Sequence, residues 1–111
     1  MEAEEFENGQ ESSSNFDLEH VRPFLERVSP LIESGFGLTE IEQVCQVVEA
    51  MEVDDEKELE FPIRYAGGDS HLRVGIFMDD EDAVDLYFFS KPELAIQIDD
   101  EMEKFFNQLE L

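Results

Sequence analysis

The side chains best suited to recognition alternate with apolar residues along predicted strands. Arginine and the aromatic residues are frequent anchors at the centres of protein interfaces, and alternate residues of a strand share one face of a sheet. One face is therefore predicted to gather basic and aromatic side chains, namely Arg64, Arg73, Gly75, Phe77, Tyr87 and Phe89. We interpret this face either as a docking surface for a partner, or as a face covered by another helix. In the second case its arginines would pair with carboxylates such as Glu60 and Asp85.

The densest run of carboxylates, Asp79-Asp80-Glu81-Asp82, is predicted to be a turn between two strands. A calcium loop of the EF-hand type needs a glycine at its sixth position and a bidentate glutamate at its twelfth. Ala83 and Val84 occupy this stretch instead, so the run does not fit such a loop. We interpret it as a solvated turn that is also a candidate surface for a basic partner.

No other combination of side chains predicts catalysis, a cofactor or a metal ion. The 30 carboxylates make any acid–base pair unspecific, because such a pair needs two distinct environments. His20 and His71 have no partner at metal-ligand spacing, and we expect both at the surface. The single cysteine, Cys45, lies on the apolar face of a predicted helix, where a buried and inert thiol is expected. We therefore predict a chain that is not an enzyme and holds no cofactor.

Net charge is the outlying property of the composition. The 30 acidic residues outnumber the 7 basic ones and give −23 over 111 residues. The negative charge is concentrated in residues 1–20, 35–56 and 79–111, whereas residues 21–34 and 57–78 are balanced. Such a field repels nucleic acid and anionic membranes and attracts basic proteins. Direct binding to nucleic acid or to membranes is therefore not expected.

Two amphipathic helices are predicted before the strands. Residues 17–34 carry apolar side chains at three- and four-residue spacing, which is the pattern of a helix with one buried face. Pro23 predicts a kink or a new helix start within this segment, because proline removes a main-chain donor. Residues 40–52 show the same spacing after the capping-box pattern Thr39-x-x-Glu42.

The apolar spacing then changes from helical to alternating, which predicts strands over residues 58–65, 72–78 and 84–88. Pro62 cannot donate to a ladder, so the first strand is predicted to lie at a sheet edge. Short connections indicate an antiparallel meander. The face of this sheet that packs on the helices is predicted to hold Leu59, Phe61, Ile63, Tyr65, Leu72, Val74, Ile76, Met78, Val84, Leu86 and Phe88.

The C-terminal segment allows two interpretations. Pro92 is typical of the first turn of a helix, which would run to the end of the chain. Equally, Leu94, Ile96 and Ile98 alternate as a fourth strand, which would precede a helix over residues 100–108. We favour the strand followed by the shorter helix.

These elements predict one α+β domain: an antiparallel three- or four-stranded meander with two N-terminal helices and one C-terminal helix. Residues 16–111 would form this domain. Residues 1–15 are acidic and almost free of aliphatic side chains, so they are predicted to be a disordered acidic tail. In size, charge and order of elements the chain resembles the type III secretion chaperones and similar small chaperone-like domains. This resemblance is one of architecture and carries no site.

We predict a non-enzymatic, acidic protein-binding module, similar in role to a chaperone, an inhibitor or an immunity protein, that acts on a basic partner protein. A first alternative is a nucleic-acid mimic whose carboxylates occupy a DNA-binding protein. A second is a domain whose acidity serves only solubility or life in high salt. A homodimer is compatible with all of these. Residues 1–14 lack the features of a secretory signal and no apolar run reaches the length of a membrane span, so a cytoplasmic location is expected.

Overall fold

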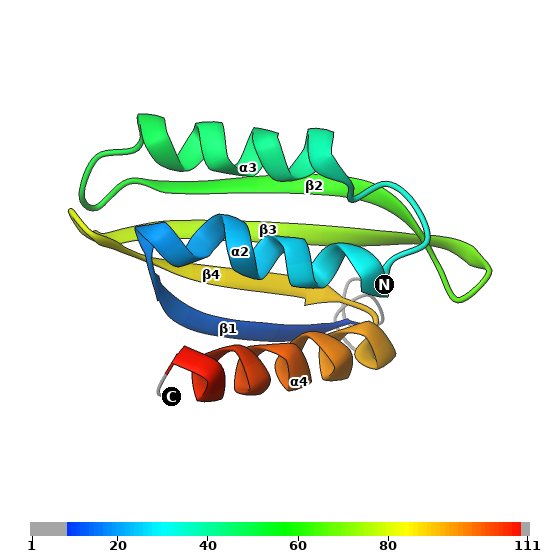
Figure 1. Ribbon diagram of the computed structural model, residues 1–111. Helices are drawn as coiled ribbons and strands as arrows, with labels where there is room; N and C mark the ends of the chain where they lie inside the picture. The colour runs from blue at the N-terminus through cyan, green and yellow to red at the C-terminus, as the bar shows by residue number, and fades with distance from the viewer. Residues whose placement is uncertain (1–8, 110–111) are drawn as a thin grey trace.

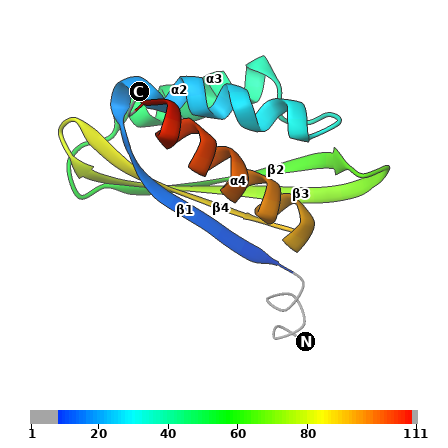
Figure 2. The same cartoon turned by 60° about the horizontal axis from the view of Figure 1, so that its bottom comes forward.

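An antiparallel sheet carries helices on one of its faces (Figure 1, Figure 2). The computed structural model describes residues 9–109. The sheet has four strands in the order β1-β4-β3-β2, so the predicted meander β2-β3-β4 is extended by β1. The predicted α+β class, with helices before and after an antiparallel sheet, is confirmed. The elements are β1 (Gln10–Asp17), α2 (Leu18–Val28), the 3-10 turn η1 (Ser29–Leu31), α3 (Leu38–Ala50), β2 (Glu56–Tyr65), β3 (Gly68–Asp80), β4 (Ala83–Ser90) and α4 (Pro92–Leu109).

Strand β1 corrects the prediction of a disordered tail over residues 1–15, because residues 10–15 belong to the sheet. β1 pairs with β4 from Gln10 opposite Ser90 to Asp17 opposite Ala83. Its inward side chains include Phe16, which is 1% exposed, and Ser12, whose hydroxyl donates to the carbonyl oxygen of Ala95 at 2.9 Å. β1 therefore forms because β4 offers a ladder and the core has room for Phe16. Residues 1–8 lie outside the described part of the chain.

Helix α2 runs without interruption through Pro23, so the predicted new start at that residue is wrong. Pro23 lies in the second turn and is exposed. The carbonyl that lacks its N–H donor belongs to Glu19, which is also exposed, so water can solvate it. The helix then ends in η1, where Pro30 occupies the first turn. The amphipathic spacing is confirmed, because Val21, Phe24, Leu25 and Val28 are buried.

Helix α3 begins two residues earlier than predicted and uses a different cap. Its N-cap is Gly37, whose N–H donates to the Glu40 carboxylate at 2.6 Å. The predicted capping box, Thr39-x-x-Glu42, is therefore wrong. Glu42 is instead free to pair with Arg22 of α2 across 2.8 Å. The buried face of the helix is the predicted one.

The meander agrees with the predicted strands. A two-residue turn joins β2 to β3, with Ala66 and Gly67 both at positive φ, as the twist of a tight hairpin requires. β2 is an edge strand, so Pro62 costs the sheet no hydrogen bond. Of the predicted core-facing residues, Leu59 and Tyr65 are only partly buried. The others are buried, namely Phe61, Ile63, Leu72, Val74, Ile76, Met78, Val84, Leu86 and Phe88.

Helix α4 corrects the favoured interpretation of the C-terminal segment, because residues 94–98 are helical and the helix continues to Leu109. Its buried residues follow helical spacing, namely Leu94, Ala95, Ile98, Met102 and Phe105. Ile96, which supported the strand interpretation, is 61% exposed. The fourth strand of the sheet is β1. None of the helices within residues 9–109 combines the length and the apolar character needed to cross a membrane.

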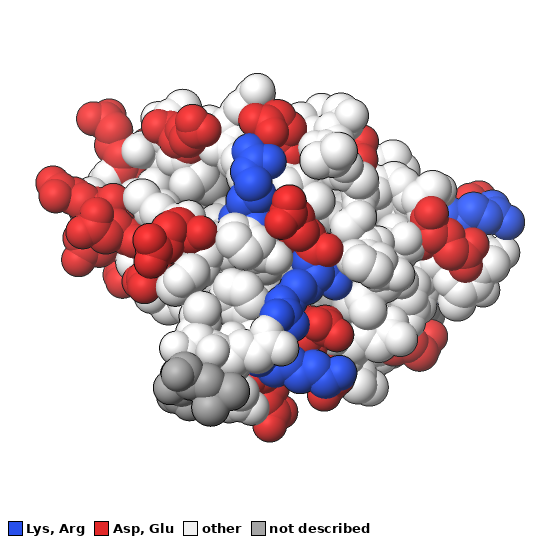
Figure 3. All heavy atoms as spheres, viewed as in Figure 1, with Lys and Arg blue, Asp and Glu red and all other residues white. Residues whose placement is uncertain are grey.

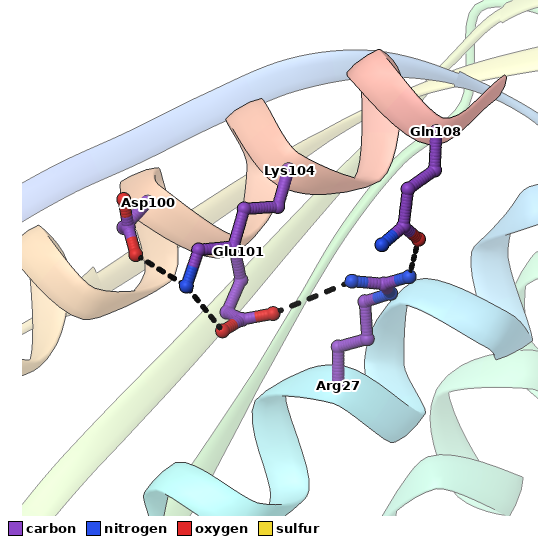
Figure 4. Close-up of polar contacts among 5 residues, drawn as sticks. All are labelled: Arg27, Asp100, Glu101, Lys104 and Gln108. Atoms are coloured by element: carbon purple, nitrogen blue, oxygen red, sulfur yellow. Dashed lines mark hydrogen bonds and ion pairs between the residues drawn. The ribbon is translucent and has the colours of Figure 1, made fainter. Parts of the chain in front are cut away.

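Basic side chains join the helices to one another. Arg27 of α2 reaches α4, where it pairs with Glu101 at 3.6 Å and donates to the side-chain oxygen of Gln108 (Figure 4). Within α4 itself, Lys104 pairs with Asp100 at 3.0 Å and with Glu101 at 3.9 Å. The Arg27 guanidinium also lies over the ring of a buried phenylalanine of α4, 5.2 Å from its centroid.

Candidate functional site

The three helices all lie on one side of the sheet, and the opposite side carries none of the helices described (Figure 2). The interpretation in which a helix covers the basic and aromatic residues is therefore wrong for residues 9–109. We call this side the open face. Strand register places on it Glu11, Ser13 and Asn15 of β1, Asp85, Tyr87 and Phe89 of β4, Arg73, Gly75 and Phe77 of β3, and Glu56, Glu58 and Glu60 of β2.

Aromatic side chains occupy the centre of the open face. Phe77, Tyr87 and Phe89 are half-buried, on the two central strands. Tyr87 lies directly opposite Gly75, and the missing side chain leaves a hollow of about 290 Å³. A Cβ atom at Gly75 would lie 3.5 Å from the Cβ of Tyr87, which is ordinary contact. The position can therefore accept a side chain, which would occupy part of the hollow.

Carboxylates flank this aromatic centre on both sides. Glu11 projects from β1 beside Phe89, and Glu58 projects from β2 beside Gly75, and both line the hollow. Arg73 is the basic member of the group. It lies over the ring of Phe89, 5.4 Å from the centroid, and it pairs with Glu60 at 3.4 Å and with Glu58 at 3.8 Å. The predicted pairing of Arg73 with a neighbouring carboxylate is thus confirmed.

The electrostatic character of the open face is visible at Tyr87. Burial is the largest influence that raises the pKa of its hydroxyl, and the carboxylates of Asp85, Glu11, Glu56 and Asp79 raise that pKa further. These four groups come from all four strands or their ends. Four carboxylates thus act together on the Tyr87 hydroxyl, and Arg73 is the basic side chain beside them in the hollow.

Two predicted groups lie away from the aromatic centre. Arg64 is near the far end of β2, opposite Asp69, and it pairs with Asp69 at 3.5 Å and with Glu33 at 3.8 Å. The acidic run 79–82 lies at the other end of the sheet, where Asp79 and Asp80 end β3 after a bulge and only Glu81 and Asp82 form the turn to β4, so the predicted turn is shorter than the run. The structure therefore unites Arg73, Phe77, Tyr87 and Phe89 but leaves out Arg64. Figure 3 shows the helix-bearing side of the molecule, where acidic side chains are densest at one end and others lie beside the Lys and Arg residues across the middle.

Sequence reasoning missed the contribution of β1. Glu11 faces Phe89 across the β1–β4 ladder. Gly9 also approaches Phe89, since a Cβ atom built on Gly9 would lie only 2.3 Å from a carbon of the ring. A larger residue at this position would therefore displace the Phe89 ring at the rim of the open face. The alternation of Glu11 with the buried Ser12 is consistent with a strand. It is weak evidence in a sequence, because serine is common both in strands and in disordered segments.

A group of possible metal ligands lies at the β1–α2 junction. Asp17, Glu19 and His20 each offer an atom within 4.8 Å of the others. His20 was predicted to lack such partners, so this proximity is a difference from the prediction. Its imidazole is only 23% exposed and packs edge-on against Phe105, with ring centroids 5.8 Å apart. Asp17 and Glu19 are exposed, and exposed acidic groups of this kind need no ion.

A groove of about 730 Å³ lies on the helix side, between α2, α3 and the β3–β4 turn. Its lining includes Leu18, Val48 and Met51, with Glu49 and Glu81 also present. Cys45 lines the groove and is buried. Burial, the largest influence, raises the pKa of the Cys45 thiol, so the thiol stays protonated near neutral pH, as an inert cysteine does.

Comparison of the chain with protein families, curated proteins and solved structures found no match. The architectural resemblance to type III secretion chaperones therefore receives no support from them.

Proposed function

We propose that this chain is a non-enzymatic binding module that holds a basic segment of a partner protein on its open face. The observation that carries the proposal is the position of an aromatic centre, Phe77, Tyr87 and Phe89, on a sheet face that no described helix covers. Apolar and aromatic groups of this kind form the centres of interfaces, and polar groups form their rims. The carboxylates around the aromatic centre give this rim a negative charge.

The charges of the open face favour arginine as the partner's main anchor. A guanidinium stacks on aromatic rings and pairs with carboxylates through two parallel hydrogen bonds. The open face offers both types of group within one hollow, with Tyr87 as an aromatic wall and Glu58 and Glu11 as carboxylates. Arg73 already makes such a contact with Phe89 inside the chain, and this supports a guanidinium as the preferred group.

The net charge of −23 extends this preference beyond the interface. Long-range attraction speeds the encounter with a basic partner and disfavours acidic ones. It is screened over about 8 Å at physiological ionic strength, so it acts on association more than on the bound state. The aromatic contacts, which salt does not screen, would hold the bound segment.

A peptide of about ten residues that alternates Arg and Val is a suitable probe, because it is long enough to span an eight-residue strand. We expect it to bind the full chain, and we expect the same peptide with Glu in place of Arg not to bind. Tyr87→Ala should weaken binding about tenfold or more, as loss of an interface anchor does. Isothermal titration at increasing salt measures both the affinity and its electrostatic part.

Two further variants separate binding from folding. Gly75→Val should narrow the hollow beside Tyr87 and weaken binding while the melting temperature stays unchanged, since valine favours strands and its Cβ fits. Ile96→Ala removes an exposed apolar side chain from α4, away from the open face, and should leave binding unchanged. If Tyr87→Ala and Gly75→Val both bind the peptide as Ile96→Ala does, the open face is not the binding surface.

A further inference from the structure

The outer edge of β1 presents unpaired main-chain groups. The N–H of Leu18 donates to the carbonyl of Asp82 at 2.9 Å, which continues the β1–β4 register by one pair. Hydrogen-bonded pairs alternate along an antiparallel ladder. The even-numbered residues of β1 therefore face β4. The N–H and C=O groups that point outward are those of Glu11, Ser13, Asn15 and Asp17.

The opposite edge of the sheet is protected, and β1 is not. On β2, the N–H of Arg64 donates to the carbonyl of Ser34 at 2.9 Å, so the even-numbered residues point outward there. Pro62 is one of them and offers no N–H, and the segment at Ser34 covers the position of Arg64. β1 contains no proline and no lysine, and its register with β4 is continuous. Within residues 9–109, no segment pairs with its outer edge.

We propose that the outer edge of β1 binds the basic partner segment as an additional strand. This inference rests on the proposed function and states how the segment is held. Neighbouring strands lie about 4.8 Å apart, and alternate side chains of the new strand would fall on the open face. There they would lie beside Glu11 and Asp17, with Tyr87 and Phe89 one strand further in. Long basic side chains at alternate positions can extend across β1 towards Glu11 and Tyr87, whereas Gly75 and Glu58 lie one and two strands beyond Tyr87.

Charge selects a basic segment over a second copy of this chain. Pairing β1 with another β1 would bring Glu11 and Asp17 of both chains to one short edge, and like charges on facing strands destabilise a sheet. A segment with arginine at alternate positions converts the same carboxylates into cross-strand ion pairs. The main-chain hydrogen bonds would supply affinity, and the alternating side chains would supply specificity.

Ser13→Pro tests the edge directly. Ser13 is exposed and its N–H points outward, so proline there removes a donor for the new strand without removing a bond to β4. Pro62 occupies the equivalent outward position on β2, which shows that this sheet tolerates proline there. Ser13→Ala is the matched control for loss of the hydroxyl. We expect Ser13→Pro to bind the Arg-Val peptide about tenfold more weakly than Ser13→Ala.

Amide hydrogen exchange on the unmodified chain gives a second measurement that does not depend on the variant's folding. The outward amides of Ser13, Asn15 and Asp17 should become protected when the Arg-Val peptide binds. The edge inference is overturned if these amides stay unprotected, or if a folded Ser13→Pro binds as well as Ser13→Ala. If Tyr87→Ala nevertheless weakens binding, the open face is still the binding surface, and only the added strand at the β1 edge is refuted. If sedimentation shows a dimer that Ser13→Pro dissociates, the occupant of the β1 edge is a second copy of this chain and not a basic segment, and the proposal is overturned.

Discussion

Replacing Phe16 by alanine removes the largest side chain that β1 contributes to the core. Phe16 is 1% exposed, and its ring lies 4.9 Å from that of Phe24, 5.1 Å from Phe106 and 6.3 Å from Phe105, centroid to centroid. Truncation of a buried phenylalanine costs the transfer of its apolar surface and leaves a cavity, together about 4 kcal/mol. In a domain of this size that loss lowers the melting temperature by roughly 20 °C.

Urea unfolding followed by far-ultraviolet circular dichroism measures this loss in the free energy of unfolding, and the chain needs no tryptophan for it. Phe16→Leu keeps most of the volume and should cost less than about 1.5 kcal/mol, which provides a usable variant if the alanine form does not fold. Leu38→Ala, at a residue that is 74% exposed, is the control and should change stability by less than about 0.5 kcal/mol. A loss below about 1 kcal/mol for Phe16→Ala would contradict the packing of β1 against the helices.

Four other substitutions test the remaining parts of the structure. Arg27→Ala should cost about 1 kcal/mol in urea unfolding, because it loses the stacking on Phe105 as well as partly exposed polar contacts. Lys104→Ala, whose side chain is 57% exposed, should cost almost nothing by the same measurement. Burial raises the pKa of the Cys45 thiol above its unfolded value, so its contribution is full below the unfolded pKa and is lost as pH rises through the folded pKa. The unfolding free energy should therefore fall in alkaline solution, and Cys45→Ala should reduce that fall; equal slopes for both proteins would contradict it. Pro62→Val restores an outward donor on β2 and should increase self-association in light scattering at unchanged stability.

Strands β2, β3 and β4 could be predicted because large aliphatic residues occupy every second position along them. Leu72, Val74 and Ile76 are all fully buried in the middle of β3. β1 lacked this signal. Its inward positions include Ser12, and a serine becomes suitable for the core only through a partner, here the carbonyl of Ala95, which lies 83 residues along the chain. Local pattern cannot report such a contact, because the partner is set by the tertiary fold.

The prediction for the C-terminal segment was wrong for a different reason. Leu94 and Ile98 fit both a strand and a helix, and Ile96 tipped the balance towards a strand. In the structure Ile96 is on the exposed side of α4, while Ala95 is fully buried. The small side chain of Ala95 brings α4 close to β1, where its carbonyl accepts the Ser12 hydroxyl. The errors at the two ends of the chain therefore have one cause. β1, which was predicted to be part of a disordered tail, is the strand that pairs with β4, and α4 packs over it.

This correction also changes the character of the candidate site. From the sequence, the segment that holds Arg73 is one of two without net charge, because residues 57–78 are balanced. In the fold, β1 and β4 bring Glu11 and Asp85 to the same face, and both raise the pKa of Tyr87. The arginine is meanwhile held by Glu58 and Glu60 of β2. The aromatic centre and the acidity thus belong to one surface. A partner that suits it must offer positive charge and apolar or planar groups together, so salt should weaken its binding without abolishing it.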